Sequence, residues 1–334
     1  MDARASKGAR PRLSFWDIFS RYREIGITVF ILILVVVVTL RTPSFLTANN
    51  LRDILMNISI LMIVALGQTM VILTKGIDLS VSSMIGLVAM MVAFVMKEHP
   101  ETPVFAIVLL GMALGTVAGS FNSIIITFGK VPPIIATLGT LSVYRGLVFF
   151  YSGGTWINSY ELPRGIKILS KGELLGLPNL IVIAFLIAVI VYLFLKYTRT
   201  GRNIFAVGSN VEAAEYAGIR PQRIVFLVYL LSGLLSGLGA VLWVSRFESA
   251  QTNTALGFEL QTVTAAVIGG VSISGGVGTV PGVILGALLL GMIQNALTLV
   301  RISPFWQLAA QGLLIIIAVV IDRVISTRVV RTST

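Results

Sequence analysis

Long apolar runs separated by short polar connectors make up most of the chain. A bilayer core needs about 20 apolar residues per helix, with a range of about 17–25. Ten runs approach this length, at roughly residues 25–40, 51–73, 80–96, 104–127, 133–151, 178–196, 223–246, 258–273, 279–300 and 305–325. This pattern predicts an all-α, polytopic integral membrane protein with about ten transmembrane helices.

Two of these runs are interrupted. The second is followed at once by the polar stretch 74–80, and the eighth contains Gly269 and Gly270 ahead of further glycines. Irregular backbone at membrane depth is tolerated only where protein or a cavity shields it. We therefore expect broken or re-entrant segments near 74–80 and 268–278, with Asp78, Gly269 and Gly270 as structural motif residues. Asp78 would cap a helix that opens at Leu79 or Ser80.

The basic residues predict an orientation. If the N-terminus is inside, about two thirds of the 25 Lys and Arg residues lie in inside segments, as the positive-inside rule requires. Both termini are then expected in the cytoplasm. The expected parts are a cytoplasmic segment 1–24, a transmembrane domain 25–325 with a cytoplasmic connector 197–223, and a cytoplasmic tail 326–334.

Composition narrows the chemistry. Hydrophobic residues make up 56% of the chain and charged residues 12%, and the mean hydropathy is +0.95. The net charge of +11 lies mainly in connectors, which favours a role in topology over nucleic-acid binding. With no Cys and a single His, thiolate or His-rich metal sites and His-based triads are excluded. Gly270–Gly276 has the glycine spacing of a phosphate-binding loop but lacks its lysine. We expect no catalysis and no cofactor in this chain, so any ATP is bound by a partner subunit.

Polar residues within the spans offer two kinds of site. Lys75, Asp78, Arg145 and Glu259 are the ionisable candidates, and Asp78 with Glu259 would carry the coupling of an ion-driven secondary carrier. Neutral amides suit a pathway for a polyhydroxylated solute, because they both donate and accept hydrogen bonds. The pathway candidates are Gln68, Asn122, Gln261 and Asn295. The alternative role of such amides is hydrogen bonding between helices, worth roughly 0.6 kcal/mol each.

Small residues recur every four positions on three spans. They predict faces where helices pack closely, at Gly111, Gly115 and Gly119, at Gly233 and Gly237, and at Gly282 and Gly286. A non-transporting membrane scaffold held together by these faces is a further alternative.

The connector 197–223 contains a short helix with its own start and stop signals. Ser209 and Glu212 have the spacing of a capping box, and Gly218 supplies a left-handed stop. So short a helix is marginal in water, so we expect it to dock onto a cytoplasmic partner. The residues expected to couple to that partner are Gly208, Asn210, Glu212, Ala213, Ala214 and Gly218.

Four segments together resemble the permease subunits of bacterial ABC-type monosaccharide importers, the branch that includes ribose, arabinose, xylose, rhamnose and autoinducer-2 systems. Gly208 to Ile219 resembles the coupling segment of that family. Residues 75–83 (KGIDLSVSS) resemble its GGIDLSVGS motif, with Lys75 and Ser82 where glycine is usual. Residues 131–140 (VPPIIATLGT) and the Gly-rich stretch 267–278 resemble two further motifs, in the same order.

The resemblance implies an importer in the inner membrane of a bacterial cell, with residues 25–325 as its permease domain. Two permease chains would form the pathway, ATP-binding cassette subunits would dock on the cytoplasmic side, and a periplasmic solute-binding protein would deliver the sugar. Stretches 144–146 and 152–157 resemble the rhamnose and autoinducer-2 branch. A permease for branched-chain amino acids is the neighbouring alternative. On the exterior connectors 152–177 and 247–257, Trp156, Tyr160 and Glu161 are candidate contacts for the binding protein, and the charges of Glu161, Lys167 and Lys171 would contribute to docking.

Overall fold

The computed structural model describes residues 23–303 and, beyond them, residues 306, 309, 312, 313 and 316. Within this part of the chain, eight helices are long and apolar enough to cross a membrane. They are α2 (Arg23–Arg41), α3 (Ala48–Leu73), α4 (Val81–Glu98), α5 (Val104–Thr127), α6 (Pro133–Ser152), α8 (Asn179–Tyr197), α11 (Pro221–Phe247) and α13 (Val280–Leu299). The first seven predicted spans and the ninth are thereby confirmed, and the tenth, 305–325, falls almost wholly outside the described residues.

The eighth predicted span is broken, as the glycines indicated. Its helix α12 (Phe258–Ile268) has 11 residues, which at 1.5 Å per residue gives about 16 Å, half of a bilayer core. Non-helical backbone follows from Gly269 until Val280 begins α13. A similar stretch separates Leu73, the last residue of α3, from Val81. The two predicted breaks are therefore real.

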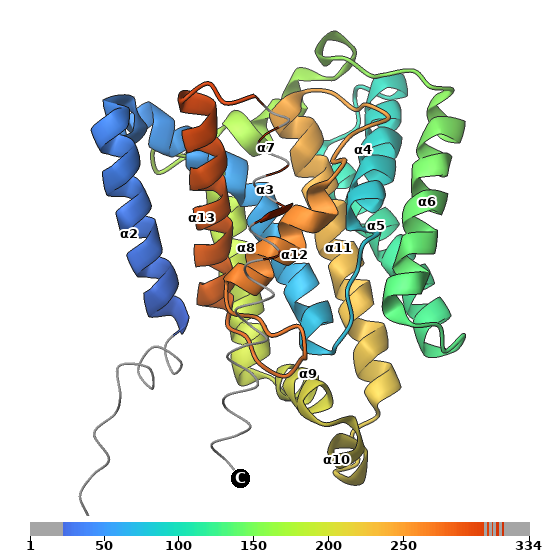
Figure 1. The fold of residues 1–334 in the computed structure, drawn as a ribbon. Coiled ribbons are helices and arrows are strands. Elements are labelled where there is room, and N and C mark those ends of the chain that lie inside the picture. The colour runs from blue at the N-terminus through green and yellow to red at the C-terminus, as the bar shows by residue number, and fades with distance from the viewer. Residues whose placement is uncertain (1–22, 304–305, 307–308, 310–311, 314–315, 317–334) are drawn as a thin grey trace, which may run out of the picture.

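The remaining elements are connectors at the two ends of the helix bundle. Figure 1 shows the helices running alternately up and down, with α9 (Arg199–Ser209) and α10 (Val211–Tyr216) at the lower end, hereafter the α9–α10 end. The opposite end carries η1 (Pro43–Leu46), η2 (Ser159–Glu161), η3 (Arg164–Lys167), α7 (Ile168–Lys171) and the hairpin of β1 (Glu173–Leu174) with β2 (Leu177–Pro178).

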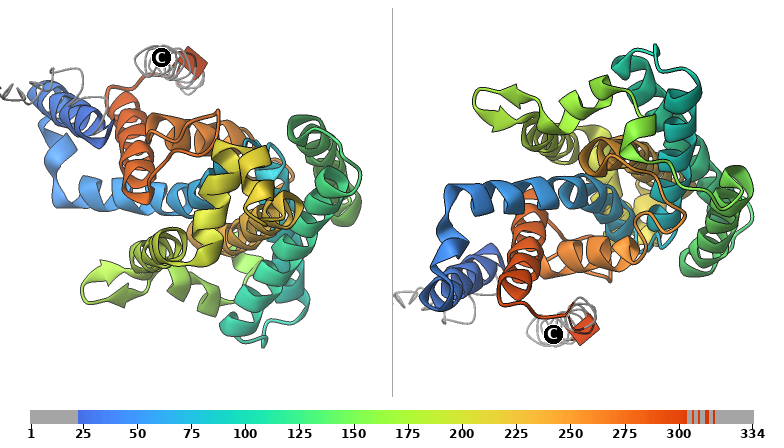
Figure 2. Two further views of the ribbon diagram at one scale, coloured as in Figure 1. Left: turned by 90° about the horizontal axis from the view of Figure 1, so that it is seen from below. Right: turned by 90° about the horizontal axis from the view of Figure 1, so that it is seen from above.

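Helix α3 lies at the centre of the bundle. Every residue from Ile58 to Leu73 is buried, and α3 contacts α8, α11, α12 and α13. Figure 2 shows these neighbours around it in both end views, with α6 at one edge and α2 at the other. The outer helices expose large apolar side chains, such as Leu40 on α2 and Phe150 on α6. Lipid is the natural solvent for such faces.

Glycine faces hold α5 and α11 together, as predicted. A Cβ on Gly115 of α5 would lie 2.3 Å from the carbonyl oxygen of Gly233 on α11, and one on Gly237 would lie 2.2 Å from that of Gly111. The backbones of α5 and α11 therefore touch, because neither helix has a side chain at the crossing.

Candidate functional site

The connector after α3 is held by a buried polar network. Asp78 is fully buried, and its Oδ1 accepts hydrogen bonds from the Ser80 N–H at 3.0 Å and the Ser80 hydroxyl at 2.7 Å. The hydroxyl of Ser232 on α11 lies 3.4 Å from Oδ2. Helix α4 begins at Val81 with Ser80 as its N-cap residue. The expected cap at Leu79 or Ser80 is thus wrong in detail: Asp78 closes the turn that leads into the helix instead of capping its first amides.

Two predicted pathway residues belong to this network. With its amide oriented to satisfy both partners, Gln68 accepts from the N–H of Asp78 and donates to its carbonyl oxygen, both at 3.1 Å. Asn122 donates to the Ser80 hydroxyl at 2.7 Å, and the Tyr144 hydroxyl lies 3.4 Å from the Asn122 Oδ1. Gln68 and Asn122 are fully buried, so in this conformation they join helices, which was the alternative role given to such amides.

The second break packs against the first. The N–H of Gly276 donates to the carbonyl oxygen of Leu73 at 3.0 Å. Gly270, Gly275 and Gly276 all have positive φ, a backbone conformation that glycine adopts without steric cost. Gly269 lies against α13, since a Cβ on it would be 2.6 Å from the Gly282 carbonyl oxygen.

Gly208 connects this junction to the cytoplasmic connector predicted from the sequence. It lies in the last turn of α9 and is buried. A Cβ on Gly208 would lie 1.7 Å from the carbonyl oxygen of Leu73 and 2.6 Å from the backbone nitrogen of Gly276. The end of α9 therefore contacts both irregular segments through bare backbone. We call Leu73, Gly208 and Gly276 the junction.

Helix α10 has both ends fixed, although one predicted cap is wrong. Ser209 is the last residue of α9, so it forms no capping box with Glu212. The N-cap is Asn210, whose Oδ1 accepts from the Ala213 N–H at 3.0 Å. At the other end Gly218 has φ +79°, and the N–H groups of Gly218 and Ile219 return to carbonyl oxygens of the helix. This confirms the predicted glycine stop.

The surface of α10 is largely open. Ala214 is only 3% exposed, whereas Tyr216 is 93% exposed. Glu212 and Ala213 are exposed as well. The two alanines that sequence reasoning treated alike thus face different surroundings: Ala214 packs into this chain, and Ala213 is free to contact another.

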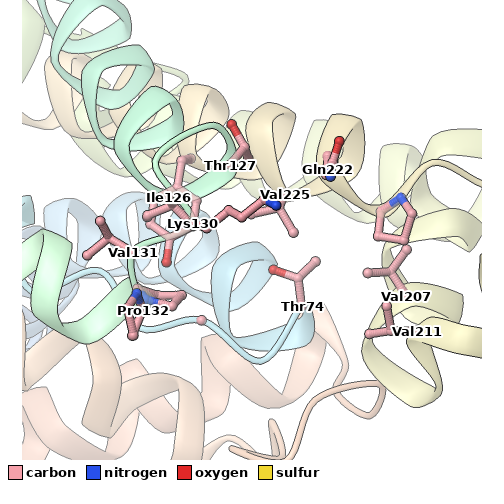
Figure 3. A pocket seen from close by; sticks show the side chains of 14 residues that line it. Thr74, Ile126, Thr127, Lys130, Val131, Pro132, Val207, Val211, Gln222 and Val225 are labelled. Carbon is pink, nitrogen blue, oxygen red and sulfur yellow. The ribbon is translucent and has the colours of Figure 1, made fainter.

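A cavity of about 430 Å³ lies beside α10. Figure 3 shows Val207 and Val211 of α9 and α10 on one side and Lys130, in the turn between α5 and α6, on the other. Thr74 lies between them, just after α3. The connector therefore has open space between itself and the α5–α6 turn.

The other two pathway candidates line a second cavity. Gln261 of α12 and Asn295 of α13 lie on its wall together with Trp243 and Arg246 of α11. Its volume is about 300 Å³. Asn295 is oriented by Asn50, since the two amides exchange hydrogen bonds of 2.8 and 3.0 Å. We call this the outer cavity, because it lies near the end of α11 that is remote from α9 and α10.

The ionisable candidates have separate environments. Among the described residues no ion pair joins Lys75 to Asp78. Arg145 donates to the carbonyl oxygens of Thr252 and Thr254 at 2.9 and 3.0 Å and so fixes the connector after α11. In the described part of the chain no group of three or more His, Asp and Glu residues is placed to hold a metal ion.

Charged residues pair with each other in the connectors at the end of the bundle opposite the α9–α10 end, hereafter the outer connectors. Glu248 accepts hydrogen bonds from Lys167 at 2.6 Å and from Lys171. With the Ser159 hydroxyl, these two ammonium groups lower the pKa of Glu248 to about 2. Lys97 binds Glu161 at 2.7 Å and likewise lowers the pKa of that carboxyl. The charges expected to contact a binding protein are therefore engaged within the chain.

The aromatic candidates on the same connector remain open. Trp156 is 51% exposed and Tyr160 is 84% exposed. They are available for a partner, the role expected of them, and equally for the lipid interface, where Trp and Tyr are enriched.

Comparison with protein families identifies the class. Residues 50–319 match the family described as branched-chain amino acid transport system / permease component. The chain belongs to this permease family. The match spans α3 to α13, and so contains both breaks, the junction and the outer cavity.

Individual permeases are similar over most of their length. The ribose import permease protein of Bacillus subtilis (strain 168) is 38% identical over 90% of this chain and 93% of its own. That of Escherichia coli (strain K12) is 35% identical, covering 87% and 91%. The autoinducer 2 import system permease protein of Salmonella paratyphi B (strain ATCC BAA-1250 / SPB7) is also 35% identical, covering 84% and 80%. No solved structure matches.

Proposed function

We propose that this chain is the membrane-spanning permease subunit of an ATP-driven importer for a monosaccharide or a similar small polar solute. The relatives are named for ribose and autoinducer 2, and sugar import is accordingly favoured over the branched-chain amino acids of the family description. Between the two branches, the higher identity to a ribose permease makes ribose the first solute to test.

The observation that carries the proposal is the exposed helix α10. It is capped at both ends by Asn210 and Gly218, and it leaves Tyr216 almost fully exposed. An exposed tyrosine beside small residues is typical of a docking surface. Through Gly208, a displacement of this connector reaches the ends of α3 and of the 269–279 segment. We propose that an ATP-binding cassette subunit docks on α10. ATP is bound by that subunit, and this chain holds no cofactor.

The other partners follow from the same proposal. A periplasmic solute-binding protein docks at the opposite end, and a second permease chain completes the pathway within the bacterial inner membrane. Both chain termini are proposed to lie in the cytoplasm. For the N-terminal side this is supported by the start of α2, which lies at the same end of the bundle as α9 and α10 in Figure 1.

Reconstitution tests the proposal. The permease is purified with its ATPase and placed in liposomes. ATP is enclosed inside the liposomes, and the binding protein and D-ribose are added outside. We expect ribose uptake and ribose-stimulated ATP hydrolysis, both lost when the ATPase is omitted. Uptake driven by a proton gradient without the ATPase contradicts the proposal and favours the secondary carrier.

A further inference from the structure

The outer cavity combines two kinds of wall that together suit a sugar. One wall is aromatic: the rings of Trp243 and Phe258 meet edge to face with centroids 5.3 Å apart, and Phe247 lies 4.8 Å from Trp243. Aromatic rings offer apolar surface to the C–H face of a pyranose or furanose ring. Such a wall with a few placed polar groups is the usual composition of a small-molecule site, and 300 Å³ lies at the small end of the usual volume range of about 300–1,000 Å³.

The same cavity is also lined by polar groups that lack partners among the described residues. The side-chain amides of Gln261 and Gln294 line the cavity, and neither has a hydrogen bond to any residue that the structure describes. The Nε of Arg246 is buried and unpartnered too, while another guanidinium nitrogen donates to Asn57 at 3.3 Å. Leaving the buried Arg246 N–H unsatisfied costs about 1–3 kcal/mol. Together with the two half-buried glutamine amides beside it, this donor points to a polar occupant.

The charges of the wall discriminate between solute classes. Among the described residues that line the cavity, Arg246 is the one ionisable side chain, and no carboxylate accompanies it. A zwitterionic amino acid needs a partner for its ammonium group as well as for its carboxylate, and burying an unpaired charge is costly. Hydroxyl groups need neither, because amides and a guanidinium N–H satisfy them directly.

We propose that the outer cavity is a monosaccharide-binding chamber on the import route, in which Trp243 packs against the sugar ring and Gln261, Gln294 and Arg246 bind its hydroxyls. This rests on the proposed function and adds to it a site within a single permease chain.

Sugar binding by the permease alone gives the direct test. The full-length chain in lipid nanodiscs, without binding protein, is titrated with D-ribose and separately with L-leucine, and binding is followed by saturation-transfer NMR. The variants are Gln261→Met, Gln294→Met and Trp243→Leu, and the matched control is Asn49→Leu, which removes an exposed amide at the same end of the bundle outside the cavity. Each glutamine has no partner to lose, so its replacement leaves folding intact even if Trp243→Leu does not.

We expect each glutamine variant to bind ribose about two- to twelve-fold more weakly, the effect of one lost hydrogen bond, and Asn49→Leu to bind as the wild type does. Unchanged binding in both glutamine variants overturns the proposal, as does the absence of ribose binding to the wild type. Tighter binding of leucine than of ribose overturns the assignment to sugars.

Uptake by the reconstituted complex distinguishes a failure of the binding chamber from a failure of the proposed function. If the wild-type complex imports no sugar with ATP, the proposed function fails. If it imports ribose and both glutamine variants do so at the wild-type rate, the chamber alone is wrong.

Discussion

The carbonyl oxygen of Leu73 accepts a hydrogen bond from the N–H of Gly276 at 3.0 Å, and the backbone of Gly208 packs on the same oxygen. Three segments far apart in the sequence thus meet at one carbonyl group. They are the end of α3, where the first irregular stretch begins, the second irregular stretch, and the end of α9. We infer that the junction moves as a unit when the cytoplasmic connector is displaced.

Gly208→Ala tests the junction. Its methyl group would lie 1.7 Å from the Leu73 oxygen, so α9 has to shift away. We expect a loss of stability of about 1–3 kcal/mol, the usual cost of overpacking, and lower ribose-stimulated ATP hydrolysis. The control is Gly139→Ala in α6, where no atom lies within 4 Å. Thermal unfolding in detergent and ATPase assays measure both effects; equal behaviour of the two variants contradicts the role of the junction.

The coupling surface predicts a contrast between neighbouring alanines. Ala213→Trp places an indole on the exposed face of α10, so the chain should fold normally while association with the ATPase falls at least tenfold. Ala214→Trp must fit the same group into a position that is 3% exposed, and therefore lowers the folded yield itself. Co-purification of the ATPase, together with the amount of monodisperse permease, distinguishes the two. Wild-type association of Ala213→Trp would remove α10 from the interface.

Capping of α10 gives a companion measurement on the same helix. Asn210→Ala removes the bond to the Ala213 N–H and should cost about 1 kcal/mol of helix stability. Glu212→Ala removes no capping bond, and should cost less than Asn210→Ala. Hydrogen exchange of the backbone amides of residues 211–217 compares the stability of α10 in the two variants.

The spans were predictable because length and hydropathy alone specify a membrane helix. The breaks were predictable as well, since Gly269 and Gly270 interrupt an apolar run. Helix α9 was missed, although its signal was present: Gly201, Ile204 and Val207 are buried at three-residue spacing. Missing it placed the N-cap of α10 at Ser209, one residue too early.

The junction and the outer cavity had no local signal. Leu73 and Gly208 are remote in sequence. A glycine in the sequence indicates that another segment of backbone can pack against it, but does not identify that segment. Gln261 and Asn295 were predicted as pathway residues because they are amides within spans. Gln68 and Asn122 have the same property. Only the packing of α11, α12 and α13 separates the two that line a cavity from the two that join helices.

Asp78 predicts a difference between two substitutions. Asp78→Asn keeps an oxygen that accepts from the Ser80 N–H and hydroxyl, so we expect folding and partial transport. Asp78→Ala leaves the Ser80 donors and the Ser232 hydroxyl without their acceptor, at about 1–3 kcal/mol for each buried donor left unsatisfied. Expression level and uptake rate are measured for both. Loss of uptake by a well-folded Asp78→Asn variant means that the charge itself is required.

Lys75 stands where the resembled family has glycine, and its φ is +66°. A left-handed backbone costs a residue with a Cβ about 1–2 kcal/mol, whereas glycine adopts it freely. Allowing for the greater flexibility of glycine in the unfolded chain, Lys75→Gly should stabilise the permease by about 0.5–1 kcal/mol. Lys97→Gly, in the last turn of α4 where the backbone is helical, relieves no such strain and removes the ion pair with Glu161, so it should instead destabilise the permease. A lower unfolding temperature for Lys75→Gly than for the wild type refutes the strain argument.

The outer connectors should loosen in acid. Lys167 and Lys171 hold the pKa of Glu248 at about 2, below its ordinary value of 4.5. A carboxyl with a lowered pKa contributes its stability above the unfolded value, so the tie is complete above about pH 5 and is lost as pH falls from 4.5 toward 2. Glu248→Gln removes the charge at every pH and should raise hydrogen exchange of residues 159–171 at pH 7. The control is Glu101→Gln, an exposed carboxyl paired with His99 alone at 3.5 Å. If exchange in Glu248→Gln matches the wild type at pH 7, the three charges do not hold the connector.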